Sequence, residues 1–292
     1  MREVVASIAR KGSLVRTPSC HRRTLAPRSP FPSPWCSLAL VLTLPYVLLL
    51  AACSSSSRLT TTTAAPTGHS MRAPSPAPTA TLEVSSQPVS FAAADGTRLA
   101  GTLYGRGMRA VILSNEGDNA SAPWRPIAQQ LAVRGYLVLS YAYRPVDANY
   151  DGLATYALSD LRGAIAFIRA RPIPITRLIL IGASLGALEE VKEAATTPCD
   201  GLVVISAPLG YQDVQISDAD LAHLRMPKLF VTSADNQPFA SDTLHMFEVS
   251  PPPKDKRVYP GDAHGVRLFA GTSGPALLSS ILEFVQRTAP VQ

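Results

Sequence analysis

The residue of this chain best suited to chemistry is Ser184, the centre of the pentapeptide Gly-Ala-Ser-Leu-Gly at 182–186. The apolar run at 178–181 leads into it, and a helix-like stretch follows. At a sharp strand-to-helix turn a serine projects its Oγ above the sheet edge, and flanking glycines leave room for the strained backbone. The helix N-terminus directs free N–H groups at developing negative charge. The pattern predicts a nucleophile; the alternative is a glycine-rich turn that closes a strand.

A serine nucleophile needs a base within hydrogen-bond reach and an acid that orients the base. Three histidines follow Ser184, and two of them, His223 and His245, lie in helix-like stretches typical of a solvated surface. The third, His264, lies in a loop directly after the strand predicted at 256–259. Because catalytic groups gather at the carboxyl ends of parallel strands, we expect His264 to be the base.

Asp235 is the favoured candidate for the acid, because it directly follows a predicted strand and lies on the same sheet edge as the other two residues. Asp262 is an alternative, but it lies two residues from His264 and would have difficulty meeting the ring nitrogen that faces away from the serine. Asp218 and Asp220 fit a helix N-terminus better. The sequence therefore predicts Asp235 as the orienting acid.

The oxyanion formed during acyl transfer needs two preorganised N–H donors. The backbone of Leu185, directly after the nucleophile, would supply one donor. The second is expected from Glu116 or Gly117, in the loop that follows the strand predicted at 110–114. A carboxylate aimed inward would oppose the oxyanion, so we expect the side chain of Glu116 to point to solvent.

Strands and helices alternate around these residues after an opening hairpin, which turns at Asp95-Gly96. Strands are predicted at 89–93, 98–104, 110–114, 136–141, 178–181, 201–206, 228–233 and 256–259, and helices near 124–134, 161–168, 218–225, 241–247 and 275–286. This order predicts an α/β fold with a mostly parallel sheet of about eight strands and helices on both faces. Residues 207–227 are too few for a large helical lid.

From residue 89 to about 288 the chain resembles α/β-hydrolases of the dienelactone hydrolase or small serine esterase type. The resemblance rests on Asp-Gly-Thr-Arg-Leu-Ala-Gly at 95–101, the helix from Trp124 that ends in Arg-Gly-Tyr, and Tyr-Ala-Tyr-Arg at 141–144. It rests also on the turn at Ser184, with Asp235 and His264 following in that order. It implies hydrolysis of carboxylic esters or related small acyl substrates through an acyl-enzyme, without metal or organic cofactor. Relatives usually carry His-Gly at 115–116 and favour small apolar residues at 187–190, where this chain departs.

The first 52 residues differ in charge from the rest. Of the chain's 27 Lys and Arg and 21 Asp and Glu, seven basic residues and one acidic residue lie there, so the remainder is formally neutral. The sequence therefore predicts no nucleic-acid partner, which would need a basic patch on the folded part. The apolar segment at 37–52 is shorter than the roughly 20 residues of a spanning helix and is interrupted by Pro45, which favours an export signal.

The sequence Leu-Ala-Ala-Cys at 50–53 resembles the lipobox of bacterial lipoproteins, whose cysteine carries diacylglycerol and becomes the new N-terminus. We expect a signal peptide at 1–52, lipid on Cys53, a flexible Ser/Thr/Pro-rich tether at 53–88 and an α/β-hydrolase domain at 89–292. The protein would then be exported and anchored on the extracytoplasmic face of the membrane. The alternatives are an ordinary signal peptide or an uncleaved anchor. Cys199 would remain as a single thiol, and no cluster has metal-ligand spacing.

Two other functions use the same predicted fold. A surface lipoprotein could bind a ligand without catalysis, which the Asn-Glu pair at 115–116 favours. An acyltransferase could use the same three residues and pass the acyl group to an acceptor other than water.

Overall fold

The computed structural model describes residues 84–147 and 149–291 of the chain. The predicted signal peptide, Cys53 and nearly all of the predicted tether lie outside the described residues. Among the residues that are described, no helix combines the length and the apolar character needed to span a membrane.

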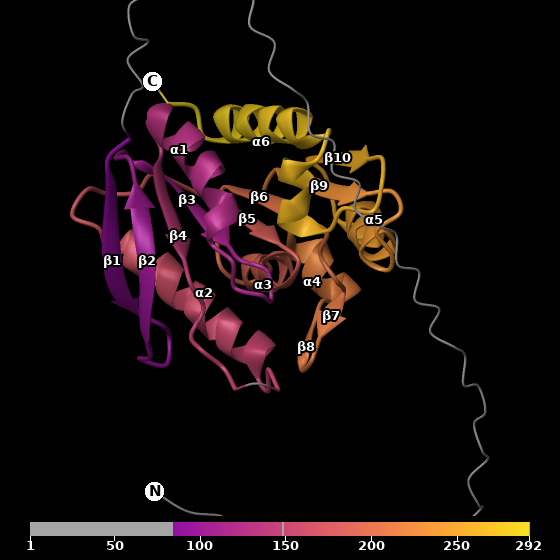
Figure 1. Cartoon of the computed structure of the whole chain (residues 1–292), viewed down its shortest axis with the longest axis horizontal. Coiled ribbons are helices and arrows are strands. Elements are labelled where there is room, and N and C mark those ends of the chain that lie inside the picture. Colours follow the sequence, from indigo (N-terminus) through magenta and orange to yellow (C-terminus); the bar gives the residue numbers. More distant parts are fainter. Residues whose placement is uncertain (1–83, 148, 292) are drawn as a thin grey trace, which may run out of the picture. The chain divides into compact units, whose positions relative to one another are not determined.

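One eight-stranded sheet forms the centre of the fold (Figure 1). Its strands are β1 (Ser86–Ala92), β2 (Arg98–Tyr104), β3 (Arg109–Ser114), β4 (Leu137–Tyr141), β5 (Arg177–Ala183), β6 (Gly201–Ile205), β9 (Lys228–Ser233) and β10 (Lys254–Tyr259). Their spatial order is β1-β2-β4-β3-β5-β6-β9-β10, and β1 and β2 pair antiparallel with their neighbours whereas the others run parallel. The predicted fold class, a mostly parallel sheet of about eight strands, is confirmed.

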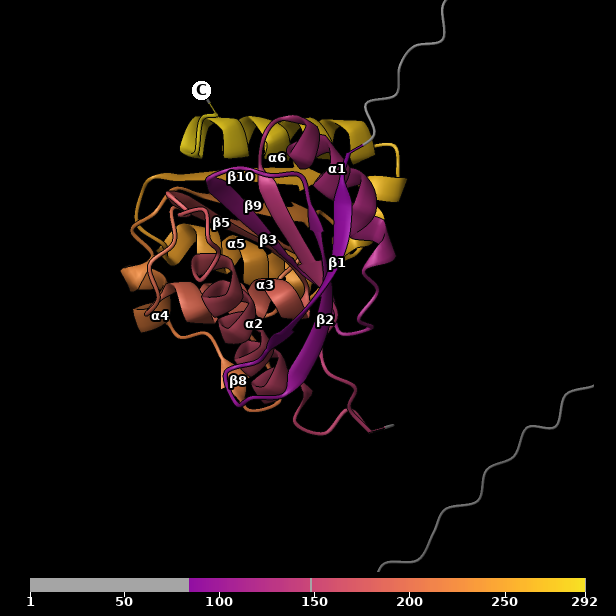
Figure 2. The ribbon, with the colours of Figure 1, turned by 90° about the vertical axis from the view of Figure 1, so that its left-hand side faces the viewer.

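Helices cover both faces of this sheet, as Figure 2 shows for α1 and α6 on one side and α2 and α3 on the other. The helices are α1 (Arg125–Val133), α2 (Leu153–Arg169), α3 (Leu185–Ala194), α4 (Asp218–His223), α5 (Phe239–Val249) and α6 (Gly274–Thr288), with 3₁₀ turns η1 (Ala122–Trp124) and η2 (Gly265–Ala270). Strand β3 explains the two-sided burial: Val111 and Leu113 face α1 and α6, and Ala110 and Ile112 face α2 and α3. A strand buried on both faces is apolar throughout.

The segment between β6 and β9 is short, as the sequence predicts. It forms the hairpin of β7 (Gly210–Tyr211) and β8 (Val214–Gln215), followed by the six-residue helix α4. Ser217 and Asp220 form a capping box at the start of α4: the Asp220 N–H donates to the Ser217 hydroxyl, and the Ser217 N–H donates to the Asp220 carboxylate. The hairpin and this helix leave no large lid over the sheet.

Two consecutive glutamates on α3, Glu189 and Glu190, are fully buried in the core. None of their four carboxyl oxygens has a hydrogen-bond partner among the described residues. Burial raises the pKa of both carboxyls well above the usual value, because water no longer solvates the charged form. We therefore expect both carboxyls to be protonated in the native protein at neutral pH. The difference from the small apolar residues that relatives favour at 187–190 thus lies in the core itself.

Stability should fall with rising pH because of this pair. A carboxyl with a raised native pKa stabilises the fold fully below its unfolded pKa, and that contribution is lost as pH rises toward the native pKa, at about 1.4 kcal/mol per pH unit. Glu190→Gln removes the titration of this carboxyl. The free energy of unfolding in urea, variant minus wild type, should therefore be more positive at pH 8 than at pH 5. Glu283→Gln, on the exposed face of α6, is the control. Parallel pH profiles for wild type and Glu190→Gln would contradict a buried neutral carboxyl.

Candidate active site

Ser184 occupies a strained turn between β5 and α3. Its backbone angles are φ 51° and ψ −115°, and a non-glycine residue rarely adopts a positive φ. The Ser184 N–H donates to the carbonyl oxygen of Ile205 at 2.9 Å, and the Leu188 N–H donates to the carbonyl oxygen of Ser184 at 3.0 Å. The serine is half-buried, in contrast to its fully buried neighbours. The strand–turn–helix predicted around Ser184 is present, with the serine accessible at the turn.

The glycines on either side of Ser184 are required by close packing. A Cβ on Gly182 would lie 2.5 Å from the carbonyl carbon of Gly186, closer than real Cβ atoms approach. A Cβ on Gly186 would lie 2.6 Å from the carbonyl oxygens of both Ser114 and Asn115, at the end of β3. The Gly186 N–H instead donates to the Asn115 carbonyl oxygen at 3.0 Å. The turn is therefore fixed directly against the loop that follows β3.

That loop brings backbone donors to the turn. The N–H groups of Leu185, Glu116 and Gly117 donate to no partner within the described part of the chain. Gly117 packs against the Leu185 side chain, since a Cβ on this glycine would lie 4.0 Å from the Leu185 Cδ2. Unpartnered backbone donors from two segments thus lie near the turn that carries Ser184.

Asn115 anchors this loop, a role that the sequence analysis missed. Its Nδ2 donates to the carbonyl oxygen of Tyr141 at 2.8 Å, and its carbonyl oxygen accepts a bond from the Tyr143 hydroxyl at 2.9 Å. Asn119 adds a second tie, because its Oδ1 accepts from the Tyr143 N–H at 2.8 Å. Asn115 thus ties the loop after β3 to the end of β4 and to the residues that follow it.

Glu116 does not point to solvent, and the expectation that it would was wrong. It is buried, and its Oε1 accepts a bond at 2.7 Å from the N–H of Val266, in the first turn of η2. Burial raises the pKa of this carboxyl, and nearby Asp118 adds to the rise, whereas the Val266 N–H and Arg267 oppose it. The loop that carries His264 covers Glu116, which a local sequence pattern does not reveal.

His264 lies in the loop after β10, as predicted, and this loop rests on the turn that carries Ser184. A Cβ on Gly265 would lie 3.5 Å from the Cβ of Ala183, and the Gly265 N–H donates to the Ser206 hydroxyl at 3.2 Å. Burial lowers the pKa of His264, and Arg267 lowers it further against a smaller opposing effect of Asp118. The imidazole is therefore neutral at neutral pH, the form that accepts a proton. No hydrogen bond joins Ser184 and His264 in the structure.

The structure places Asn236, and not the predicted acid Asp235, beside the His264 imidazole. Asp235 is exposed, its backbone N–H donates to the carbonyl oxygen of Gly261 at 2.9 Å, and no hydrogen bond joins its carboxylate to His264 in the described residues. The next residue, Asn236, is buried, and its Nδ2 lies 3.0 Å from the Nδ1 of His264. The alternative Asp262 is exposed as well. An amide thus stands where the sequence predicted a carboxylate.

The orientation of the Asn236 amide decides what His264 can do. If Nδ2 donates to Nδ1, the imidazole proton lies on Nε2, and this nitrogen cannot accept a proton from Ser184. Rotation of the amide by half a turn brings Oδ1 to Nδ1, so that Nδ1–H donates to it and Nε2 is free as the base. An asparagine holds the base in this way in Cys-His-Asn enzymes. It fixes the tautomer but adds no negative charge to stabilise the imidazolium.

The other two histidines of the folded part lie away from this site, as expected for surface residues. His223 Nδ1 is 2.6 Å from the Ala219 carbonyl oxygen within α4, and His245 Nε2 is 2.9 Å from the Asp218 carboxylate. In residues 84–147 and 149–291 no group of three or more His, Cys, Asp or Glu side chains could hold a metal ion.

No family model and no curated protein matches the chain. Solved structures do. An esterase of Pyrococcus furiosus superposes with a TM-score of 0.59 at 16% identity, over 70% of this chain and 92% of that one. A dienelactone hydrolase of Anabaena variabilis superposes with a TM-score of 0.60 at 18% identity, over 70% of this chain and 98% of that one. The esterase domain of a Rhodothermus marinus protein superposes with a TM-score of 0.55 at 18% identity, over 70% of this chain and 98% of that one. This chain has the α/β-hydrolase fold.

In the α/β-hydrolase fold the nucleophile lies on a strand-to-helix elbow, and oxyanion donors come from the residue after it and from the loop after β3. Ser184, Leu185 and the Glu116-Gly117 pair occupy these places. The third member of a triad normally precedes the histidine in the chain. Asp235 and Asn236 both precede His264 in the chain, and of these two Asn236 contacts the imidazole.

Exchange of the amide for a carboxylate should raise activity. Replacing the triad aspartate by asparagine costs about 10⁴-fold in kcat in a serine protease. We therefore expect Asn236→Asp to raise kcat for p-nitrophenyl acetate by about tenfold or more. The new carboxylate favours the imidazolium, which raises the pKa of His264 and moves the acid limb of the kcat/KM profile to higher pH.

Asp235→Asn provides the matched control, one residue away with the reverse charge change. It should change kcat by less than about twofold, because an exposed charge in high dielectric acts weakly. A loss of several orders of magnitude in Asp235→Asn, with no gain in Asn236→Asp, would return the orienting role to Asp235.

Proposed function

We propose that this protein is a serine hydrolase that cleaves carboxylic esters or related small acyl compounds through an acyl-enzyme. The observation that carries the proposal is the strained Ser184 turn beside unpartnered N–H donors and the loop of a neutral His264. A positive φ in a non-glycine residue costs free energy, and such strain concentrates at functional sites.

In the proposed reaction the Ser184 Oγ attacks the acyl carbonyl carbon while His264 Nε2 takes the hydroxyl proton. The oxyanion accepts hydrogen bonds from the N–H of Leu185 and from the N–H of Glu116 or Gly117. When the oxyanion collapses, His264 gives the proton to the leaving alcohol, and an acyl ester on Ser184 remains. Water then attacks this ester with His264 again as the base, which releases the acid and restores the serine.

The substrate class follows from what surrounds the site. The hairpin and six-residue helix between β6 and β9 are too short for a large lid, which favours a small or extended acyl group over interfacial lipolysis. The names of the similar solved structures, esterases and a dienelactone hydrolase, agree with ester chemistry. Transfer of the acyl group to an acceptor other than water would use the same residues.

One arrangement favours a second candidate, a binding protein without catalysis. Asn236 adds no charge behind the imidazole, and Glu116 brings a carboxyl close to the loop that holds the oxyanion donors. Both features would lower catalytic power, so turnover is the quantity that separates the two functions.

Loss of the serine hydroxyl should abolish turnover. Ser184→Ala should lower kcat/KM for p-nitrophenyl acetate by about 10³-fold or more, since removal of a triad nucleophile commonly costs several orders of magnitude. Ser279→Ala, an exposed serine of α6, should leave the rate unchanged. If Ser184→Ala hydrolyses the ester as fast as wild type, Ser184 is not the nucleophile. A wild-type protein inactive on a panel of esters would favour binding.

The proposed location is the extracytoplasmic face of a membrane, through lipid on Cys53 as the only attachment. A single acyl chain binds membranes marginally, whereas two or more hold a protein stably, and diacylglyceryl cysteine supplies at least two. Cys53→Ser should therefore lose metabolic labelling by a fatty-acid analogue and leave the membrane fraction. Cys199→Ser is the matched control and should keep the label, because burial raises the pKa of the Cys199 thiol to about 12. Label on Cys53→Ser would refute the lipoprotein assignment.

A further inference from the structure

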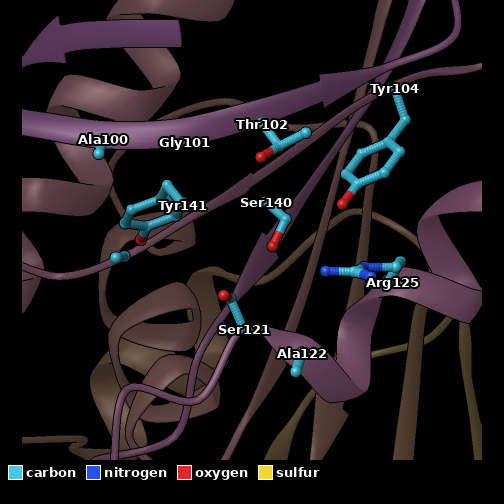
Figure 3. Close-up of a pocket in the computed structure, with 10 residues that line it drawn as sticks. Ala100, Gly101, Thr102, Tyr104, Ser121, Ala122, Arg125, Ser140 and Tyr141 are labelled. Carbon is cyan, nitrogen blue, oxygen red and sulfur yellow. The ribbon is translucent and has the colours of Figure 1, made fainter. Parts of the chain in front are cut away.

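A polar cavity of about 250 Å³ lies between β2, β4 and the start of α1 (Figure 3). Its lining includes Thr102 and Tyr104 of β2, Ser140 of β4, and Ser121 and Arg125 from the segment that leads into α1. Ser184 and His264 are not among the lining residues. The cavity is therefore distinct from the candidate active site.

The side chains of this cavity converge on one space. Figure 3 shows the Arg125 guanidinium and the Tyr104 hydroxyl directed toward Ser140, with the Ser121 hydroxyl facing the same space. Thr102 and Ser140 are paired across β2 and β4, so their side chains lie on one face of the sheet. One cation and several hydroxyl groups thus surround a single volume.

These groups lack partners in the protein. Within residues 84–147 and 149–291, no hydrogen bond or ion pair involves the side chains of Arg125, Tyr104 or Ser140, nor those of Thr102 and Ser121. Tyr104 and Ser140 are only 8% and 5% exposed. Arg125 and Ser121 are exposed, so the cavity opens to solvent, and water can pair with its polar groups when no ligand is bound. Their hydrogen-bonding capacity is available for a ligand.

We infer that this cavity binds a small oxyanion, a carboxylate, phosphate or sulfate group. A guanidinium pairs with such anions through two parallel N–H···O bonds, and the hydroxyls can donate to the remaining oxygens. A metal cation is disfavoured because Arg125 carries the same sign of charge. The volume is below the range of about 300–1,000 Å³ that takes drug-sized ligands, so it fits one anionic group or a very small acid.

Binding at this cavity should hold in place the segment between Gly117 and the start of α1. Ser121 and Arg125 follow Glu116 and Gly117 in the chain, and an anion would connect them to Ser140 on β4. The inferred binding does not use Ser184, so it goes beyond the proposed hydrolase function and does not depend on it.

The test is a titration of the full-length protein with inorganic phosphate and, separately, with acetate, at constant ionic strength. Both probes are followed by the backbone amide NMR signals of Ser121 and Ser140. At least one probe should shift these signals saturably, and the same shift should occur in Ser184→Ala. Tighter binding of phosphate indicates a phosphate or sulfate ligand, and tighter binding of acetate indicates a carboxylate.

Two variants locate the site. Arg125→Gln should raise the Kd about tenfold or more, the cost of a lost charge-assisted hydrogen bond, and Ser140→Ala should raise it severalfold. Arg134→Gln makes the same charge change at the other end of α1, where the Arg134 guanidinium is bonded to Gln130, and should leave the Kd unchanged. Absence of saturable shifts with both probes, or equal losses in Arg125→Gln and Arg134→Gln, would overturn the inference.

Discussion

The contact between the turn at Ser184 and the end of β3 is the constraint on which the site depends. Gly186 approaches the carbonyl oxygens of Ser114 and Asn115 so closely that any side chain would force the two segments apart. This approach sets the Leu185 N–H beside the loop that holds Glu116 and Gly117. Adjacent parallel strands, β3 and β5, make the contact possible because both end at the same sheet edge.

The sequence was sufficient to predict the sheet, the two layers of helices and the turn at Ser184, because apolar periodicity and glycine spacing are local signals. It was insufficient for the partner of His264. The sequence places both Asp235 and Asn236 directly after a strand, but which of them contacts His264 depends on the path of a loop 28 residues further along the chain. Glu116 was misplaced for a similar reason, since its partner Val266 is 150 residues away in the chain.

The environment of the site favours the uncharged forms of its two titratable side chains, His264 and Glu116. Burial lowers the pKa of His264 and raises the pKa of Glu116, so both groups tend toward their uncharged forms. Asn236 lies against the imidazole and adds no charge to it. In the proposed reaction the imidazolium would form without a carboxylate behind it, which raises the free energy of the transition state. A hydrolase built in this way is expected to work slowly on activated acyl groups.

The central claim is that Ser184 is an activated nucleophile, and mapping of a covalent adduct tests it most directly. The folded protein is treated with a fluorophosphonate probe, digested and analysed by mass spectrometry. We expect one probe per chain, bonded to the Oγ of Ser184, and no adduct when the protein is denatured before treatment. An adduct on a different residue, such as Ser206, whose hydroxyl accepts from the Gly265 N–H, or ester hydrolysis by a protein that forms no adduct, would contradict this assignment.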